Sequence, residues 1–418
     1  MAEPGERRWL RRGRSQEADG PRPGEFALLS YYGLGLTTLL LLVIGLVMVF
    51  SVLSVGLATG EDSRAREMYH YAFFPVVGVL LALMVSLLPL SVLRRLWVLF
   101  FPLALLAQAL TLTGLGQDVN GNRSWLRLPG IGLVQPGEFL KVGLVLLLGS
   151  LVVRFHDRLN SAKVLLGWIG VPVLLALGLV LGGADLGTVI VMALIVAGAL
   201  WLGGLSWKPL LVAGSLAFVG FVAGSMSTYS RRSRILDWLG VGIHDYQGVG
   251  YQPRNALSAI ATGGWTGVGL GSSRQKWGYL TQSESDYIFA IVCEELGLLG
   301  GLLVLLLFLA FGYFCMRIMR RSQDLFTTVT VGAIACWVVG QALINMAVVV
   351  RVLPVLGVPL PLISRGGSSL IAVLLAVGVL LCLARHEPGA QEALDVRSQA
   401  VRRTLAVITP RRRKHDRS

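Results

Sequence analysis

Long apolar runs of about twenty residues recur along most of the chain and are separated by short polar segments. A helix of that length crosses the hydrocarbon core of a bilayer, whereas a barrel strand would show alternation over about ten residues. The pattern therefore predicts an all-α polytopic membrane protein with about ten transmembrane helices. The predicted spans are 30–57, 70–91, 96–115, 137–153, 164–182, 186–204, 209–227, 286–316, 326–350 and 366–384.

The distribution of Lys and Arg predicts the orientation. An even number of spans places both tails on one side, and positive charge marks the cytoplasmic side. That side receives Arg94–Arg95, Arg154, Arg158, Lys163, Arg317, Arg320, Arg321 and the arginine-rich tails. We therefore expect both termini in the cytoplasm and a large extracellular loop, Thr228–Ser285, between spans 7 and 8.

The chain divides into a membrane domain and two tails. Residues 1–27 form a tail rich in Arg, Glu, Pro and Gly, a composition typical of disorder. Residues 28–386 form the transmembrane domain. Residues 387–418 form a basic cytoplasmic tail, expected to lie near anionic headgroups or to dock a partner.

Composition narrows the functional classes. The chain is 54% hydrophobic and 14% charged, against about 25% charged residues in soluble domains. The net charge of +14 is explained by membrane topology, so no nucleic-acid partner is predicted. The four cysteines all fall in apolar runs, which excludes a disulfide framework and metal-ligand spacing. No nucleotide-binding or zinc-protease motif occurs.

The predicted outer loop is unusually basic. It holds six Lys or Arg residues against three acids, with ten interleaved glycines. An anionic substrate on the outer face would explain this charge, although long loops partly escape the positive-inside rule. The candidate anion-binding residues are Arg231, Arg232, Arg234, Arg274 and Lys276.

Asp286 is the strongest candidate for chemistry. It stands where the basic loop meets the eighth span, and a carboxylate at the mouth of a membrane helix is costly. Ser285 and Asp286 both suit a helix N-cap. The functional alternative is a general base or a metal ligand, and the two roles can coexist. Glu294 and Glu295 lie deeper in the same span and need partners inside the bundle.

Further polar groups lie at the outer ends of other predicted spans. Pro136 fits the first turn of the fourth span, where Glu138 and Lys141 form an intrahelical pair or face a polar cavity. Asp185 starts the sixth span and suits its N-cap. Arg123 and Trp125 suit the headgroup level. Gly366 and Gly367, at the start of the last span, could present N–H groups to an anion.

The residues resemble the SEDS family (shape, elongation, division and sporulation; the FtsW/RodA/SpoVE group) over Leu28 to His386. The strongest part of the resemblance is the signature Asn345-x5-Arg351-Val352-x-Pro354-Val355-x-Gly357-Val358-x3-Leu362-Ile363-Ser364-x-Gly366-Gly367-Ser368-Ser369. The loop and the eighth span add Gly250-Tyr251-Gln252, Gly267 to Trp277, and Ser285 to Ala290 with Glu294-Glu295-Leu296-Gly297. The third part is Gln135-Pro136-x-Glu138 and Asp185-Leu186-Gly187-Thr188. Departures occur at Gly137, Ala184, Asn255-Ala256, Thr281, Glu284 and Arg365.

The resemblance implies polymerisation of lipid II into peptidoglycan glycan strands, with Asp286 as the essential carboxylate. It implies a divalent cation, Mg²⁺ or Mn²⁺, which Asp286 could ligate. It also implies a class B penicillin-binding protein as transpeptidase partner, other divisome proteins, and a site at the septum. Ser364 and Ser368 join the predicted substrate-binding residues through the signature. The arginine-rich tails favour the division branch over the elongation branch.

Three other functions compete with polymerisation. A lipid II flippase would need charges through both leaflets, whereas the candidate charges gather at the outer side. A secondary transporter often shows paired half-repeats, and none is evident. A division scaffold leaves the charge and glycine density of the outer loop unexplained.

Overall fold

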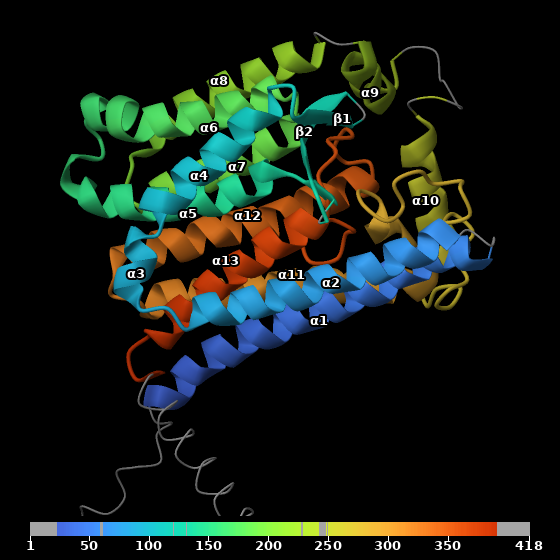
Figure 1. Ribbon diagram of the computed structural model, residues 1–418, viewed down its shortest axis with the longest axis horizontal. Helices are drawn as coiled ribbons and strands as arrows, with labels where there is room; N and C mark the ends of the chain where they lie inside the picture. The colour runs from blue at the N-terminus through green and yellow to red at the C-terminus, as the bar shows by residue number, and fades with distance from the viewer. Residues whose placement is uncertain are drawn as a thin grey trace, which may run out of the picture.

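All ten apolar runs form helices in the computed structural model (Figure 1). The structure describes residues 23–58, 62–119, 121–130, 132–226, 229–241, 248 and 250–390, with side chains for all of these except 23–27, 56–70, 225 and 229–231. The helices are α1 Pro23–Ala58, α2 Asp62–Ser86, α4 Trp97–Thr111, α5 Pro136–Arg154, α6 Val171–Gly182, α7 Leu186–Leu202, α8 Trp207–Met226, α11 Ile288–Arg321, α12 Leu325–Val349 and α13 Gly367–Arg385. The predictions for residues 1–22 and 391–418 lie outside the described residues.

The helical fold class is confirmed, whereas the number of spans stays a prediction. Seven helices in the described part of the chain are long and apolar enough to cross a membrane. The other three predicted spans contain shorter apolar helices, Tyr71–Ser86, Trp97–Thr111 and Leu186–Leu202. In the fifth predicted span the wide helical turn η2, Lys163–Gly170, precedes α6.

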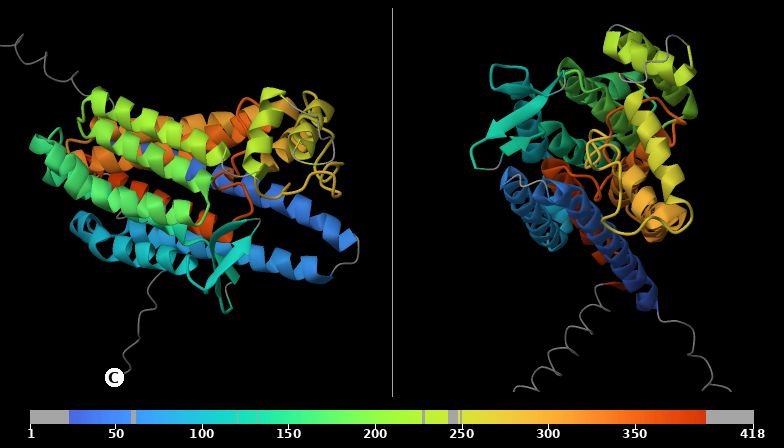
Figure 2. Two further views of the ribbon diagram at one scale, coloured as in Figure 1. Left: turned by 90° about the horizontal axis from the view of Figure 1, so that it is seen from above. Right: turned by 90° about the vertical axis from the view of Figure 1, so that its right-hand side faces the viewer.

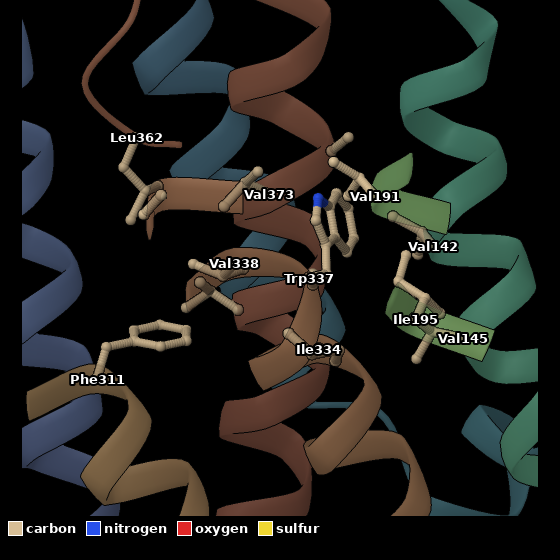
Figure 3. Close-up of a cluster of buried hydrophobic side chains, with 14 of the residues drawn as sticks. Val142, Val145, Val191, Ile195, Phe311, Ile334, Trp337, Val338, Leu362 and Val373 are labelled. Atoms are coloured by element: carbon tan, nitrogen blue, oxygen red, sulfur yellow. The ribbon is translucent and has the colours of Figure 1, made fainter. Parts of the chain in front are cut away.

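Helices α11, α12 and α13 run through the middle of the bundle, with α1 and α2 on one side and α4 to α8 on the other (Figures 1 and 2). Trp337 of α12 is fully buried beside Val142 of α5 and Val191 of α7 (Figure 3). Outside the bundle these side chains would contact lipid tails, which are equally apolar. Close packing, rather than expulsion from water, therefore holds the helices together.

One end of the bundle carries most of the irregular structure, and we name it the loop end (right in Figure 1). It holds a small antiparallel sheet that the helical prediction missed, in which β2 Asn122–Leu128 pairs with β1 Gly116–Val119 and β3 Gly132–Val134. It also holds α9, Tyr229–Leu239, and α10, Tyr251–Gly263, inside the predicted outer loop. The short helices α3, Leu90–Arg95, and η1, His156–Arg158, lie elsewhere along the chain.

The eighth predicted span is interrupted. Helix α11 contains a non-helical residue, Gly297, with φ 71° and ψ −172°. A β-carbon there would lie 2.4 Å from the Gly267 nitrogen and from the Trp265 carbonyl oxygen. Only glycine allows both the positive φ and this approach of the loop backbone.

The packed domain extends beyond the predicted boundary at residue 386. Glu387 is buried and pairs with Arg321 at 3.2 Å, and Ala390 is also buried. At the other end, α1 begins at Pro23, before the predicted boundary at residue 28.

Replacing Gly378 by Ala should destabilise the bundle. The new methyl group would lie 2.6 Å from the carbonyl oxygen of Ala82 on α2, and a backbone atom of a packed helix cannot move aside cheaply. We expect the thermal unfolding midpoint of the purified protein to fall by about 2 °C or more. The matched control is Gly178→Ala on α6, where nothing lies within 4 Å, and it should leave the midpoint unchanged or raise it. Equal midpoints for both variants would contradict the packing argument.

Candidate functional site

Asp286 lies at the loop end in the turn just before α11. The helix N-cap is Tyr287, and no side chain caps it, so the prediction that Ser285 or Asp286 caps this helix is wrong. The Asp286 carboxylate is therefore not engaged with the first turn of α11. It lies beside Gly357, where a β-carbon would be 3.8 Å from Oδ2 of Asp286.

Three consecutive backbone carbonyls hold the segment that carries Asp286. The Glu284 carbonyl accepts from the Arg365 N–H at 2.7 Å, and the Ser285 carbonyl accepts from Ser364 Oγ at 2.6 Å. The Asp286 carbonyl accepts from Asn345 Nδ2 at 2.8 Å. Each donor comes from α12 or from the segment entering α13. The position of Asp286 is therefore fixed by residues about sixty to eighty positions away.

Glu284, two residues before Asp286, forms an ion pair with Arg365. The Arg365 Nη1 to Glu284 Oε1 distance is 3.1 Å, and both side chains are about three-quarters buried. A second carboxylate this close to Asp286 could raise its pKa or help to hold a metal ion. Its charge is instead matched by Arg365, and Glu284 is not among the groups that shift the pKa of Asp286.

The electrostatic environment of Asp286 combines burial with two neighbouring charges. Burial raises the pKa of the carboxyl from 3.8 to about 6, Arg234 opposes this shift, and Asp185 adds to it. Arg234 and Asp185 also share an open hollow of about 520 Å³ between α7, α8 and α9. The two charges that influence Asp286 therefore both line this hollow.

Asp185 is the N-cap of α7, as predicted. Its carboxylate accepts from the Thr188 N–H at 3.0 Å and from Thr188 Oγ1 at 2.9 Å. Gln135 Nε2 donates to the same carboxylate at 2.7 Å. Burial raises the pKa of Asp185, against these hydrogen bonds.

Glu138 and Lys141 form the predicted intrahelical pair on α5, with both Glu138 oxygens 2.9 Å from Lys141 Nζ. Lys141 also donates to Gln341 Oε1 at 3.2 Å, and Gln341 Nε2 donates to the Pro359 carbonyl at 2.8 Å. The pair is almost completely buried and lines a small hollow of about 170 Å³ together with Gly357. Glu138 and Lys141 therefore support the segment beside Asp286 from the interior.

Glu294 and Glu295 have the internal partners that their depth requires. Glu295 pairs with Lys276 at 3.1 Å and accepts from Ser51 Oγ at 2.8 Å. Glu294 accepts from Ser273 Oγ and from the Arg274 N–H. The Lys276 ammonium is therefore committed to this buried network, contrary to the prediction that it binds an anionic substrate.

Of the other predicted cations, Arg232, Arg234 and Arg274 are exposed at the loop end, while the side chain of Arg231 lies outside the described residues. A residue that the sequence analysis did not single out, Asp237, fixes the helix that carries Arg234. Asp237 accepts from Arg351 at 3.0 Å and from Arg254 at 3.3 Å.

The remaining predicted residues are placed around this centre. Ser364 braces the Asp286 segment, and Ser368 Oγ accepts from the Gln135 N–H at 3.2 Å. Gly366 is the N-cap of α13 and Gly367 its first residue. Arg123 and Trp125 lie on β2, where the Arg123 N–H donates to the Gly183 carbonyl at 2.8 Å. These contacts are all made within the protein.

The described residues offer no protein cage for a metal ion, because no three His, Cys, Asp or Glu side chains come together among them. Asp185 is occupied by Thr188 and Gln135, and Glu284 by Arg365. Asp286 remains as a single carboxylate ligand. A Mg²⁺ ion bound through one carboxylate and substrate phosphates is compatible with that donor set.

Comparison with known proteins identifies the family. A family model described as "Cell cycle protein" (FtsW/RodA/SpoVE) matches residues 33–388. The probable peptidoglycan glycosyltransferase FtsW of Mycobacterium tuberculosis is 34% identical over 374 residues, which cover 89% of this chain and 71% of that protein. Stage V sporulation protein E of Bacillus subtilis is 33% identical over 368 residues, covering 84% and 95%.

Solved structures agree with the sequence relatives. A chain of a peptidoglycan synthase complex superposes with a TM-score of 0.69 and 26% identity, covering 85% of this chain and 98% of that one. The rod shape determining protein RodA of Thermus thermophilus superposes with a TM-score of 0.61 and 25% identity, covering 85% and 97%. The chain therefore belongs to the FtsW/RodA/SpoVE family of multi-pass membrane proteins.

Proposed function

We propose that this protein is a peptidoglycan glycosyltransferase that polymerises lipid II into glycan strands for cell division. Its relatives named FtsW, at about one-third identity, support the activity and the division branch. The observation that carries the proposal is Asp286, whose backbone is held from α12 and the entry of α13, and whose carboxyl group is close enough to Arg234 to feel its charge. A base and a cation are the two groups that the transfer of a sugar from a pyrophosphate requires.

The reaction is a single displacement at the anomeric carbon of the donor. The 4-hydroxyl oxygen of the acceptor sugar forms a bond to this carbon, and the bond to the pyrophosphate oxygen breaks. The hydroxyl proton passes to the Asp286 carboxylate, and undecaprenyl pyrophosphate departs with the bonding electron pair. Arg234, with Arg232 and Arg274 from the same end of the molecule, would stabilise the negative charge on the pyrophosphate.

A divalent cation, Mg²⁺ or Mn²⁺, is part of the proposal. Asp286 would hold it together with the pyrophosphate of the substrate, as befits an ion that usually keeps few protein ligands. When bound, the cation would neutralise charge on the departing group.

We propose that the loop end faces the outside of the cytoplasmic membrane, that both termini are cytoplasmic, and that the protein acts at the septum. A class B penicillin-binding protein is the proposed transpeptidase partner, alongside other divisome proteins. One similar chain belongs to a complex whose description couples polymerization with crosslinking, which supports this pairing. An elongation role is the nearest alternative, since RodA is also structurally similar.

The distribution of charge disfavours lipid II flipping. Asp286, Asp185, Glu138 and the Lys276–Glu295 pair all lie toward the loop end. Among the described residues, the ion pairs of the opposite end are Arg94–Asp324 and Arg321–Glu387, which join the ends of helices rather than line a route between them. A headgroup pathway through both leaflets would need polar groups along its whole length.

Asp286→Asn should reduce lipid II polymerisation by the purified protein at least 100-fold, the scale of a lost general base. The amide keeps the shape of the side chain but cannot accept the hydroxyl proton. Elution and thermal unfolding should match wild type, because the Asp286 backbone carbonyl, not its side chain, makes the contact to Asn345. Asp157→Asn, an exposed acid distant from the loop end, should keep full activity. Substantial glycan polymer from folded Asp286→Asn protein would refute the proposed base.

Polymerisation should rise with pH through the pKa of Asp286. This pKa is raised to about 6, so the carboxylate is mostly protonated below that pH and available as a base above it. Arg234→Gln removes the charge that opposes the shift and should move the midpoint of the kcat/KM profile to higher pH. Arg232→Gln, on the same helix but not among the charges that influence Asp286, should leave the midpoint near that of wild type. A downward shift for Arg234→Gln would contradict the assignment.

Removal of divalent cations with EDTA should abolish polymerisation, and added Mg²⁺ or Mn²⁺ should restore it. Lipid II should bind the Asp286→Asn variant with less dependence on Mg²⁺ than it binds wild type, because one cation ligand is lost. Full activity in excess EDTA would remove the cation from the proposal and leave the role of Asp286 as base untouched.

A further inference from the structure

The segment Trp265–Tyr279, which follows α10, exposes an unusual amount of apolar surface, and we name it the aromatic loop. Trp265, Leu270, Trp277 and Tyr279 are each between 53% and 71% exposed. Large apolar side chains gathered on a loop rarely face water and usually mark a protein or membrane contact.

Backbone hydrogen bonds fix the depth of the aromatic loop along α11. Val268 N–H donates to the Glu294 carbonyl at 3.0 Å, and Gly269 N–H donates to the Glu295 carbonyl at 3.1 Å. On the next turn, Leu299 N–H donates to the Trp265 carbonyl at 3.2 Å. Glu295 is seven residues, or about 10 Å of helix, inside the start of α11. The loop therefore lies alongside the spanning helix rather than above it.

A contact with α1 gives the same depth independently. Lys276 Nζ donates to Ser51 Oγ at 3.1 Å and to the Ser51 carbonyl at 3.3 Å. Ser51 lies within the candidate membrane span Leu28–Val55 and seven residues before the end of α1. Helices of 36 and 34 residues are about 50 Å long, against about 30 Å of hydrocarbon. A level about 10 Å from their ends corresponds to the boundary between headgroups and acyl chains.

The polar groups of the aromatic loop are arranged for a medium with little water. Lys276 and Glu295 are buried at 2% and 0% exposure and neutralise each other. Glu295 also accepts from the Gly271 N–H at 3.0 Å, so part of the loop backbone is satisfied internally. Arg274 remains exposed, at the level where lipid phosphates lie.

We propose that the aromatic loop is an interfacial anchor seated in the outer leaflet, with its aromatic and leucine side chains against lipid and Arg274 at the phosphates. Trp and Tyr favour this level because their rings have an apolar body and a polar edge. The exposed side chains of Leu299, Leu302 and Leu303 continue the apolar surface along α11 at bilayer depth, where lipid is the surrounding medium. The anchor does not depend on the proposed enzymatic activity.

Spin labels provide the test. Single cysteines at Leu270, Leu303 and Asp157 are labelled in a chain whose four native cysteines are replaced by alanine, in phosphatidylcholine–phosphatidylglycerol nanodiscs. Accessibility to oxygen and to a water-soluble nickel chelate then reports depth. Leu303 should be the most protected from nickel, Asp157 the most accessible, and Leu270 intermediate with at least threefold less nickel access than Asp157. Equal nickel access at Leu270 and Asp157 would overturn the anchor, and would favour a protein partner for this surface.

A second measurement retains the native cysteines. Lipids brominated near the headgroup end of the acyl chain quench tryptophan fluorescence only on contact. The double variant Trp265→Phe and Trp277→Phe should lose a clear part of the quenchable fluorescence of the wild-type protein. Unchanged quenchable fluorescence would place both indoles outside the bilayer and refute the proposal, whatever the activity of the variant.

Discussion

The absence of water in the bilayer is the constraint on which the arrangement of this protein depends. Every charge or backbone group at membrane depth must find a partner within the protein, or remain unsatisfied at a cost of several kcal/mol. Lys141 meets Glu138 and Gln341 inside the bundle, and Lys276 meets Glu295 beneath the loop end. These networks are where irregular backbone is allowed, because the protein itself satisfies its polar groups. The polar side chains of the candidate site lie at the same end, where the protein supplies partners for buried polar groups.

Helix α12 organises that irregular backbone. Gln341 and Asn345 are four residues apart, so they lie on one face of the helix. Gln341 donates to the Pro359 carbonyl, and Asn345 donates to the carbonyls of Val358 and Asp286. One face of a single helix thus joins the segment before α13 to the segment before α11. Asp286, the proposed base, is therefore positioned by α12 although it belongs to no helix itself.

The helices were predictable because apolar length alone specifies a spanning helix. What could not be predicted depends on contacts between distant residues. The positive φ of Gly297 follows from the approach of Gly267, and the commitment of Lys276 follows from Ser51 and Glu295. The cap at Asp185 was predictable since its partner Thr188 is local, whereas Asp286 resembled a cap and is not one. The Asp185 cap, whose partner is close in sequence, was therefore predicted correctly. The contacts of Lys276 and Gly297 with distant residues were not predicted.

Two departures from the family pattern explain each other. Glu284 and Arg365 were separate exceptions in the sequence, and in the structure they form one ion pair, reinforced by the Arg365 N–H on the Glu284 carbonyl. An unmatched carboxylate two residues from Asp286 would be expected to disfavour ionisation of the base. Arg365 neutralises it and fastens the same segment to the entry of α13. Burial therefore remains the main cause of the raised pKa of Asp286, with Arg234 lowering this pKa and Asp185 raising it.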